Sequence, residues 1–346
     1  MSLRDEILEQ PEAARRQLSA SQDAIEALVD RLRVRPVASV VVAARGTSDH
    51  AAIYAQYVLG VQNRLSVGLA TPSVVSLYDA EPEVRDSLVI GISQSGSSPD
   101  IVGVVESARR QGGPTLAITN DPGSPLAATA EFVIDLAAGP ELAVAATKTY
   151  TTSLLAIARV SAALARKSPT TLASVPDWIA AALEVEPAVR ALAVELAAVP
   201  SAIDRCVIVG RGFEYATARE WALKLKELAR VFADPYSAAD FLHGPIALVQ
   251  PGIPVLVLAP GGAAAAGQID LLRDLKSRGI DTVVVSDNPE TRDLGRWSIA
   301  LPGGIPEPLR PIVSIVPAQL FAYHLTRARG LDPDNPRSLS KVTRTT

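Results

Sequence analysis

The feature that most constrains this fold is an internal repeat with one constant offset. An Arg-Gly pair follows a short apolar run in both halves, at Arg45 and at Arg211, and 211 minus 45 is 166. Two further pairs of landmarks share this offset, Ser87 with Ile253 and Thr115 with Asp281. One long offset indicates a duplicated domain rather than a solenoid, in which repeats recur every ~20–50 residues.

Within both copies, continuous apolar runs alternate with longer segments of helical periodicity. Such runs, which lack a strict polar alternation, are typical of parallel strands covered by helices on both faces. The runs that we expect to be strands are 37–44, 87–93, 115–119, 132–137, 206–210, 254–259 and 282–286. The sequence therefore predicts an α/β protein with two tandem, doubly wound parallel-sheet domains related by duplication.

Breaks in these patterns suggest the domain boundaries. Residues 1–34 are expected to form a helical lead-in, in which Pro11 starts a new helical segment. The first domain is placed at 35–168 and the second at 169–330, because the stretch KSPTTLASVPD interrupts the helical pattern there. Residues 331–346 are Pro-rich and polar, so we expect them to form a C-terminal arm.

Composition and charge argue against several classes of protein. The 346 residues carry 33 Lys and Arg against 37 Asp and Glu, and this net charge of -4 argues against nucleic-acid binding. With a single cysteine, Cys206, and three scattered histidines, the chain is expected to have no disulfide, no metal site and no cofactor. The N-terminus lacks an apolar signal core, and apolar stretches break before the ~20 residues needed to span a bilayer. We therefore expect a cytoplasmic protein that does not bind membranes.

The loop that follows the run 87–93 differs between the two copies. It reads SQSGSS and places Ser93, Gln94, Ser95 and Ser98 just before Pro99, a residue favoured in the first turn of a helix. Hydroxyls and backbone N–H groups at such a position suit an anion, and ligands of open α/β sheets bind beyond the carboxyl ends of the strands. The second copy reads APGGAAAA, without a hydroxyl. The contrast favours a phosphate site in the first copy over a serine-rich turn with a plain N-cap.

Two other loops have both a structural and a functional interpretation. Thr47 and Ser48 follow the first strand, where they either cap the next helix or contact a sugar. His243 stands in a turn-like stretch beside Asp240, where it is either an acid/base group or a solvated loop residue; taken alone, the motif favours the solvated loop residue.

The segment 219–232 has the periodicity of an amphipathic helix. The apolar stripe of this helix consists of Trp221, Leu225, Leu228 and Phe232. Lys224 borders the stripe, and Glu227 lies further round the helix, outside the stripe. Their i,i+3 spacing is that of an ordinary ion pair worth ~0.2–0.5 kcal/mol.

At these residues the chain resembles the sugar-isomerase (SIS) domain family, and in particular the tandem-SIS isomerase half of glucosamine-6-phosphate synthase. The resemblance covers nearly the whole chain, and seven motifs in order make it specific. They are EQP (9–11), GTS (46–48), SQSGSS (93–98), VAATK (144–148), ALKLKE (222–227), HGPIAL (243–248) and LSKVT (339–343).

The resemblance implies a phosphosugar ligand and a role for each matching residue. The phosphate would be bound by Ser93, Gln94, Ser95 and Ser98, and the sugar by Thr47, Ser48, Val144, Ala146 and Ser340. Glu227 would move a proton between C1 and C2, His243 would open the ring from the neighbouring subunit of a homodimer, Lys341 would form an imine, and Lys224 would assist it. These side chains suit the chemistry, since an enediol needs a carboxylate base and an imine needs an amine nucleophile.

Three departures from the synthase affect the expected activity. Ala146 replaces a serine of the family, Asp240 stands at a glutamate position, and the chain lacks a glutaminase domain. The ending LSKVTRT is also more similar to the stand-alone deaminases and deglycases. We therefore expect a deaminase/isomerase that converts an amino-sugar 6-phosphate, glucosamine 6-phosphate first, into a ketose 6-phosphate and ammonia.

Three alternatives remain open at this point. They are a deglycase for a fructosamine-type 6-phosphate, an isomerizing aminotransferase without its glutaminase domain, and a non-catalytic phosphosugar sensor. A sensor would lack the acid/base residues, whereas Glu227, His243 and Lys341 are all present.

Overall fold

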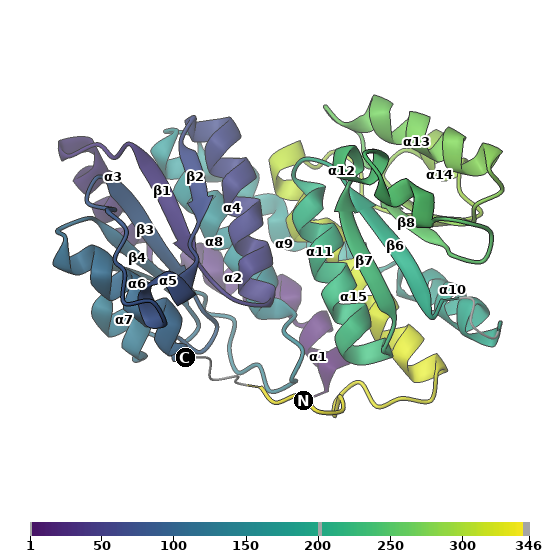
Figure 1. Ribbon diagram of the computed structural model, residues 1–346, viewed down its shortest axis with the longest axis horizontal. Helices are drawn as coiled ribbons and strands as arrows, with labels where there is room; N and C mark the ends of the chain where they lie inside the picture. The colour runs from purple at the N-terminus through teal and green to yellow at the C-terminus, as the bar shows by residue number, and fades with distance from the viewer. Residues whose placement is uncertain (1, 200–202, 342–346) are drawn as a thin grey trace. The chain divides into compact units, whose positions relative to one another are not determined.

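The computed structural model describes residues 2–199 and 203–341, which divide into two compact units (Figure 1). The N-terminal unit comprises Gln10–Glu141, Lys148–Pro176 and Ser340–Thr346, of which 340 and 341 are described at the C-terminus. The C-terminal unit comprises Met1–Glu9, Leu142–Thr147 and Asp177–Leu339. Neither unit is continuous in sequence, because short segments of each half are built into the other.

The N-terminal unit is built on a five-stranded parallel sheet in the order β2-β1-β3-β4-β5. Its strands are β1 (Ser39–Ala43), β2 (Ser66–Leu69), β3 (Ser87–Ile92), β4 (Thr115–Thr119) and β5 (Phe132–Asp135). Its helices are α2 (Gln10–Ser19), α3 (Gln22–Val34), α4 (Thr47–Asn63), α5 (Pro72–Ser76), α6 (Pro99–Arg110), α7 (Pro125–Thr129), α8 (Lys148–Leu164) and the 3-10 helix η1 (Pro169–Ser174).

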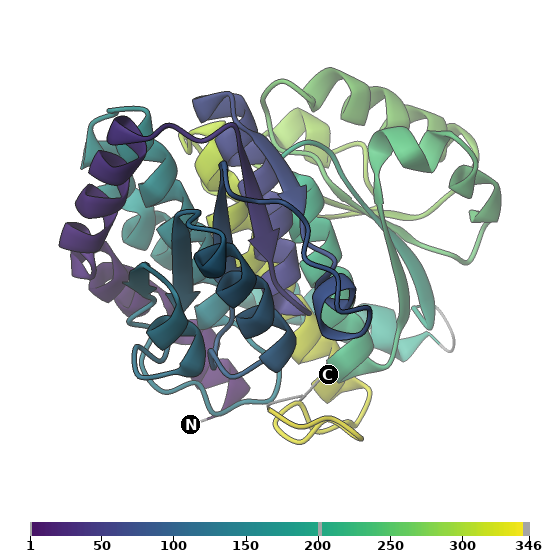
Figure 2. The same ribbon diagram turned by 60° about the vertical axis from the view of Figure 1, so that its left-hand side comes forward.

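Helices cover both faces of this sheet, as its continuous apolar strands require (Figures 1 and 2). Helices α6 and α7 pack on one face, where Val105 and Leu126 join Val89 and Ala117 in the core. Helices α4 and α8 pack against each other on the opposite face. All six residues of β3 are buried, which explains why the strand is apolar after Ser87.

The C-terminal unit repeats this architecture in a sheet of order β10-β9-β8-β6-β7. Its strands are β6 (Arg205–Gly210), β7 (Phe232–Ser237), β8 (Val255–Leu258), β9 (Thr282–Ser286) and β10 (Trp297–Ala300). Its helices are α1 (Leu3–Leu8), α10 (Glu186–Ala198), α11 (Glu214–Lys224), α12 (Ala238–Leu242), α13 (Ala265–Ser277), α14 (Pro289–Arg292), α15 (Arg310–Ala328), the π-helix η2 (Leu225–Ala229) and the 3-10 helices η3 (Pro245–Leu248) and η4 (Glu307–Leu309). Helix α9 (Val175–Leu183) crosses the division between the units.

The two sheets confirm the predicted fold class and duplication. Strand β1 begins at Ser39 and β6 at Arg205, and 205 minus 39 is 166; β2 and β7 begin at Ser66 and Phe232, again 166 apart. The sequence did not reveal β2, β7 or β10. All three are edge strands with several exposed or half-buried residues, so none has a continuous apolar run.

The single helix predicted over 219–232 is wrong in its second half. Helix α11 ends at Lys224, a π-helical turn occupies 225–229, and Arg230 adopts a left-handed conformation that ends the helix. Phe232 then begins β7 and is 80% exposed instead of lying on the apolar stripe. The pattern was misread because the edge strand follows the helical segment after only two residues, Arg230 and Val231.

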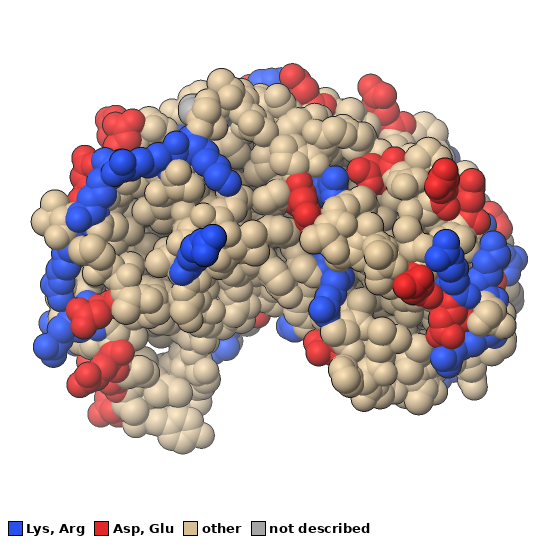
Figure 3. Space-filling model, turned by 90° about the horizontal axis from the view of Figure 1, so that it is seen from above, with Lys and Arg blue, Asp and Glu red and all other residues tan. Residues whose placement is uncertain are grey.

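None of the described helices is long and apolar enough to cross a membrane. On the face seen in Figure 3, acidic and basic side chains lie interspersed among uncharged residues.

Candidate functional site

The serine loop of the N-terminal unit is a tight turn between β3 and α6. The Ser93 hydroxyl accepts the N–H of Gly96 at 3.1 Å, and the Ser95 hydroxyl accepts the N–H of Ser97 at 3.3 Å. Gly96 has φ +60°, and a Cβ there would lie 2.0 Å from the Ser124 hydroxyl. Only glycine fits this turn, which fixes the positions of the serines on either side.

The end of the loop places the Ser98 hydroxyl and the first backbone N–H groups of α6 close together. Ser98 occupies the N-cap position, yet its side chain makes no capping hydrogen bond, so the plain N-cap interpretation is not realised. The Gln94 carbonyl accepts the Asn120 N–H at 3.1 Å and thereby anchors the loop to the residue after β4. The first N–H groups of α6 and its dipole favour an anion here by ~0.3–1 kcal/mol.

Arg45, which in the sequence was only a landmark of the repeat, lies at the same edge of the sheet. The Arg45 Nε donates to the Asp100 carboxylate at 2.8 Å, and Asp100 is buried in the first turn of α6. Arg45 itself is half exposed. Its position in an Arg-Gly pair directly after the first strand was the sequence signal that could have suggested a role in anion binding.

The GTS motif lies beside the serine loop because β1 and β3 are neighbouring parallel strands. Gly46 has φ +55° and takes the N-cap position of α4, which then begins at Thr47. The helix has no side-chain cap, so neither Thr47 nor Ser48 serves as one. The structure thus brings Thr47, Ser48 and the serine loop to one edge of one sheet.

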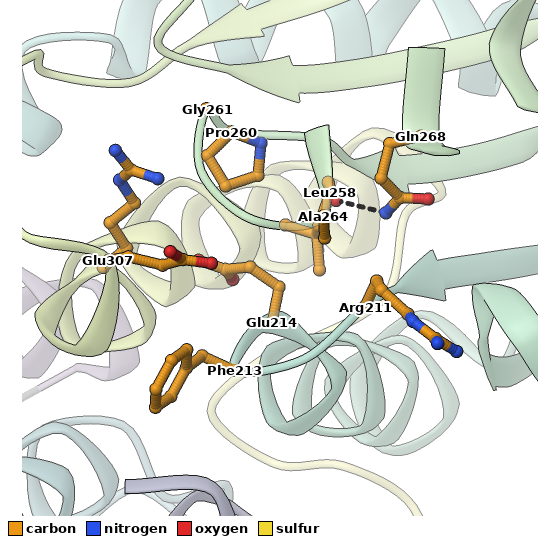
Figure 4. A pocket seen from close by; sticks show the side chains of 10 residues that line it. Arg211, Phe213, Glu214, Leu258, Pro260, Gly261, Ala264, Gln268 and Glu307 are labelled. Carbon is orange, nitrogen blue, oxygen red and sulfur yellow. Dashed lines mark hydrogen bonds between the residues drawn. The ribbon is translucent and has the colours of Figure 1, made fainter. Parts of the chain in front are cut away.

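The matching edge of the C-terminal unit is filled by the chain itself (Figure 4). The Glu307 carboxylate accepts the N–H of Ala263 at 3.2 and 3.3 Å, and Ala263 matches Ser97 at the 166-residue offset. Asp287 likewise accepts the N–H of Gly261 at 2.8 Å. Glu214 also lines this pocket, and burial raises its pKa. The pocket holds about 20 Å³, room for one water molecule.

A buried lysine between two carboxylates is the main charged feature of the C-terminal unit. The Lys224 Nζ lies 2.5 Å from Oε2 of Glu227 and 3.4 Å from Oε1 of Glu220. The side chains of Lys224 and Glu220 are 1% and 0% exposed, whereas that of Glu227 is 23% exposed. Burial alone would lower the pKa of Lys224, but the two carboxylates outweigh it and raise the pKa, so the ammonium form is held.

The sequence suggested an ordinary ion pair of Lys224 with Glu227, whereas the structure shows a buried lysine paired with two carboxylates. Glu220, one turn before Lys224, was missed, although its i,i+4 spacing was visible. Glu227 stands in the π-helical turn, and such turns often occur at functional sites. A carboxylate fixed by a buried ammonium and still partly exposed can accept a proton from a ligand and return it.

His243 lies on the surface of the C-terminal unit. It ends α12, where its N–H donates to the Asp240 carbonyl at 3.1 Å, and its side chain is exposed. Within the part of the chain that the structure describes, its imidazole has no hydrogen-bond partner. The flanking Leu242 and Leu248 are 54% and 59% exposed.

Val144 and Ala146 lie in the segment Leu142–Thr147, which belongs to the C-terminal unit. Both are partly buried, and the buried Glu6 of α1 holds this segment through the N–H groups of Leu142 and Ala143 at 2.5 and 3.1 Å. Nothing in the sequence indicated that α1 supports these positions.

Lys341 forms an ion pair that the sequence did not suggest. Its Nζ lies 2.8 Å from the buried carboxylate of Glu141, which also accepts the N–H and the hydroxyl of Thr149 at 3.1 and 2.8 Å. Ser340 beside Lys341 is exposed, and the last two residues of the LSKVT motif lie outside the described residues.

Across residues 2–199 and 203–341, no group of three or more His, Cys, Asp and Glu side chains is arranged to hold a metal ion. The described site residues are hydroxyls, carboxylates, amines and one imidazole, which suit proton transfer and anion binding.

Comparisons with known proteins agree with the duplication. The model of the SIS domain matches residues 34–163 and 201–328. The isomerizing glutamine–fructose-6-phosphate aminotransferase of Thermococcus kodakarensis is 34% identical over 352 residues, which cover 97% of this chain and 56% of that protein. The chain thus spans about half the length of the curated relatives it matches.

Two solved structures resemble the whole chain. One, described as a phosphosugar isomerase of Silicibacter pomeroyi DSS-3, is 35% identical with a TM-score of 0.86 and covers 96% of this chain and 100% of its own. The C-terminal domain of glucosamine-fructose-6-phosphate aminotransferase from Francisella tularensis is 25% identical with a TM-score of 0.84, covering 96% and 98%. The matches in both halves and relatives above 30% identity show that the chain belongs to the SIS domain family, with phosphosugar isomerases among its relatives.

Proposed function

We propose that this protein is a phosphosugar isomerase that acts as a deaminase on an amino-sugar 6-phosphate, with glucosamine 6-phosphate as the first substrate to test. Water would be the second reactant, and fructose 6-phosphate and ammonia the products. The observation that carries the proposal is the buried group of Glu220, Lys224 and Glu227, which holds a carboxylate ready for proton transfer.

The serine loop would bind the phosphate end of the substrate. The Ser98 hydroxyl, the Ser95 hydroxyl proton and the start of α6 offer donors to an anion, and Arg45 adds positive charge at the same edge. Binding of this remote group would hold the reacting carbons in place. Thr47, Ser48, Val144, Ala146 and Ser340 are proposed to contact the sugar.

The proposed reaction is a proton shift followed by hydrolysis. After His243 opens the ring, Glu227 takes the proton from C2 and delivers it to C1, while a second proton passes from the C2 nitrogen to O1. The C1 aldehyde thereby becomes an alcohol and the C2 amine an imine. Lys341 displaces ammonia from C2 by forming its own imine there, and water then releases the ketone and restores the lysine. Lys224, held as an ammonium, keeps Glu227 oriented.

We also propose that the active form is a homodimer in which His243 acts in the site of the neighbouring subunit. The exposure of His243, and of the apolar side chains of Leu242 and Leu248 near it in sequence, supports this proposal.

The test is an assay of the purified protein with glucosamine 6-phosphate, in which ammonia and fructose 6-phosphate should form in equal amounts. Glu227→Gln should lower kcat by about 10²–10⁴-fold, because it removes the proton acceptor, while substrate affinity stays nearly unchanged. The control is Glu290→Gln, which changes an exposed glutamate of α14 in the same unit.

Two outcomes would reject this function. One is the absence of turnover with glucosamine 6-phosphate and a panel of related amino-sugar phosphates. The other is a Glu227→Gln variant that keeps wild-type activity, which would show that Glu227 does not transfer the proton.

A further inference from the structure

Two of the proposed sugar contacts, Val144 and Ala146, lie in a segment of the C-terminal unit that is neither helix nor strand. This segment comprises residues 142–147. Such a segment lacks the regular ladder of backbone hydrogen bonds, so its conformation depends on the groups that bind its N–H and C=O groups. Whatever holds the segment therefore also decides where Val144 and Ala146 lie.

Buried side chains hold both ends of this segment. Near its start, Oε1 of the fully buried Glu6 accepts the N–H groups of Leu142 and Ala143 at 2.5 and 3.1 Å. At its other end, the buried Gln319 of α15 donates from Nε2 to the Thr147 carbonyl at 3.4 Å. Hydrogen bonds to a carboxylate are roughly twice as strong as those between neutral groups. Glu6 is therefore the stronger of the two supports.

The carboxylate of Glu6 is not needed to begin helix α1. Ser2 and Asp5 already form a complete capping box, in which the Ser2 hydroxyl accepts the Asp5 N–H at 3.2 Å and the Asp5 carboxylate accepts the Ser2 N–H at 2.8 Å. Asp5 is exposed, whereas Glu6 is buried, and burial of a carboxylate is costly unless hydrogen bonds offset it. The two N–H groups of the segment supply such hydrogen bonds.

Helix α1 is itself fixed within the C-terminal unit. Arg4 donates from Nε and Nη2 to the two carboxylate oxygens of Glu186, at the start of α10, at 2.7 and 2.8 Å. The Leu3 N–H donates to the Asp334 carboxylate at 2.6 Å, and α1 packs against α15. The hydrogen bonds from Arg4 lower the pKa of Glu186, which keeps this carboxylate ionised and the pair intact. Glu6 is thus presented to the segment from a fixed helix.

We propose that Glu6 is a positioning residue, which holds residues 142–147 in the conformation that lets Val144 and Ala146 contact the sugar. The inference rests on the proposed function, in which these two residues bind the substrate. Glu6 acts through the backbone of the segment and not by contact with the substrate. The segment contacts the sugar in the ground state and in the transition state alike, so its displacement weakens substrate binding and leaves the chemical step unchanged.

The experiment compares Glu6→Ala and Glu6→Gln with the wild-type protein in the glucosamine 6-phosphate assay. Glu6→Ala removes the acceptor of two N–H groups, so KM should rise about tenfold while kcat stays within about twofold. Glu6→Gln keeps an acceptor oxygen without the charge and should give an intermediate KM. The control is Asp5→Asn, at the exposed neighbour of Glu6 in the same helix, which should leave both constants unchanged.

Hydrogen–deuterium exchange of the segment adds a measurement that does not depend on activity. The amides of Leu142 and Ala143 should exchange about tenfold faster in Glu6→Ala than in the wild-type protein, because their acceptor is gone. In Asp5→Asn they should exchange at the wild-type rate.

The outcomes separate this inference from the proposed function. A wild-type KM in Glu6→Ala, or a loss of kcat with KM unchanged, would overturn the positioning role and leave the deaminase intact. If Glu6→Ala does not fold, Glu6→Gln decides, and a wild-type KM there overturns the inference. If no phosphosugar is turned over, the proposed function fails, and calorimetry with glucosamine 6-phosphate replaces KM. Equal affinities of wild type and variant, or unchanged exchange of the two amides, would then overturn the inference as well.

Discussion

Single residues at the end of β3 differ in what they contribute to the serine loop. The serines supply hydroxyls, whereas Gly96 makes the turn possible, since its φ of +60° and the nearby Ser124 leave no room for a side chain. The sequence predicted the serines as candidate ligands. It could not reveal that Gly96 is required, because the reason is a contact with Ser124, which lies beyond β4.

We expect Gly96→Ala to destabilise the protein more than Gly112→Ala. Both positions have positive φ, which costs alanine about 1–2 kcal/mol, but a Cβ at Gly112 has no atom within 4 Å. The clash at Gly96 should add about 1–3 kcal/mol and weaken phosphosugar binding. Urea unfolding measures the two free energies, and equal losses would contradict this account of the loop.

At the scale of secondary-structure elements, helix α11 and its π-helical continuation organise the acid/base group. The α-helix places Glu220 and Lys224 one turn apart, and the π-turn carries Glu227 back to the same ammonium. The sequence indicated an amphipathic helix with an ion pair of ordinary strength. Burial of Lys224 and Glu220 changes that expectation, because a buried charge is stable only when it is paired.

Lys224→Met should cost about 3–5 kcal/mol of folding free energy, since it leaves the buried Glu220 without its ammonium. The double variant Lys224→Met/Glu220→Gln should recover part of this loss. As a control, Arg278→Met at the C-cap of α13 removes an exposed i,i+4 pair with Asp274 and should cost less than about 1 kcal/mol. Chemical denaturation of the three variants tests the prediction, which fails if the double variant is as unstable as the single one.

At the scale of the whole molecule, the two copies of one architecture differ in the loops at the carboxyl ends of their strands. Both sheets have the same strand order, yet the N-terminal copy presents hydroxyls where the C-terminal copy binds its own Glu307. The acid/base group belongs to the C-terminal copy. The duplication thus separates the proposed phosphate-binding task from the proposed proton-transfer task.

Two inactive variants should restore activity when they are mixed, if His243 acts across a dimer. In a heterodimer of His243→Ala and Glu227→Gln chains, one of the two sites has both wild-type residues. Random mixing should then give about one quarter of wild-type activity, as the symmetry of a dimer requires. Activity of the co-expressed pair measures this, and a mixture as inactive as its components would show that each chain supplies its own His243.

The sequence by itself determined the fold class, the duplication and the central strands, because buried parallel strands must be apolar along their whole length. It also singled out the serine loop, through the contrast between the two copies. Only the tertiary structure decided which polar residues are held together. Burial and contacts distant in sequence decide four features that the sequence did not reveal. They are the edge strands, the pairing of Glu220 with Lys224, the pairing of Lys341 with Glu141 and the exposure of Phe232. A linear pattern records the periodicity of an element, whereas charge pairing in the interior depends on which elements fold against one another.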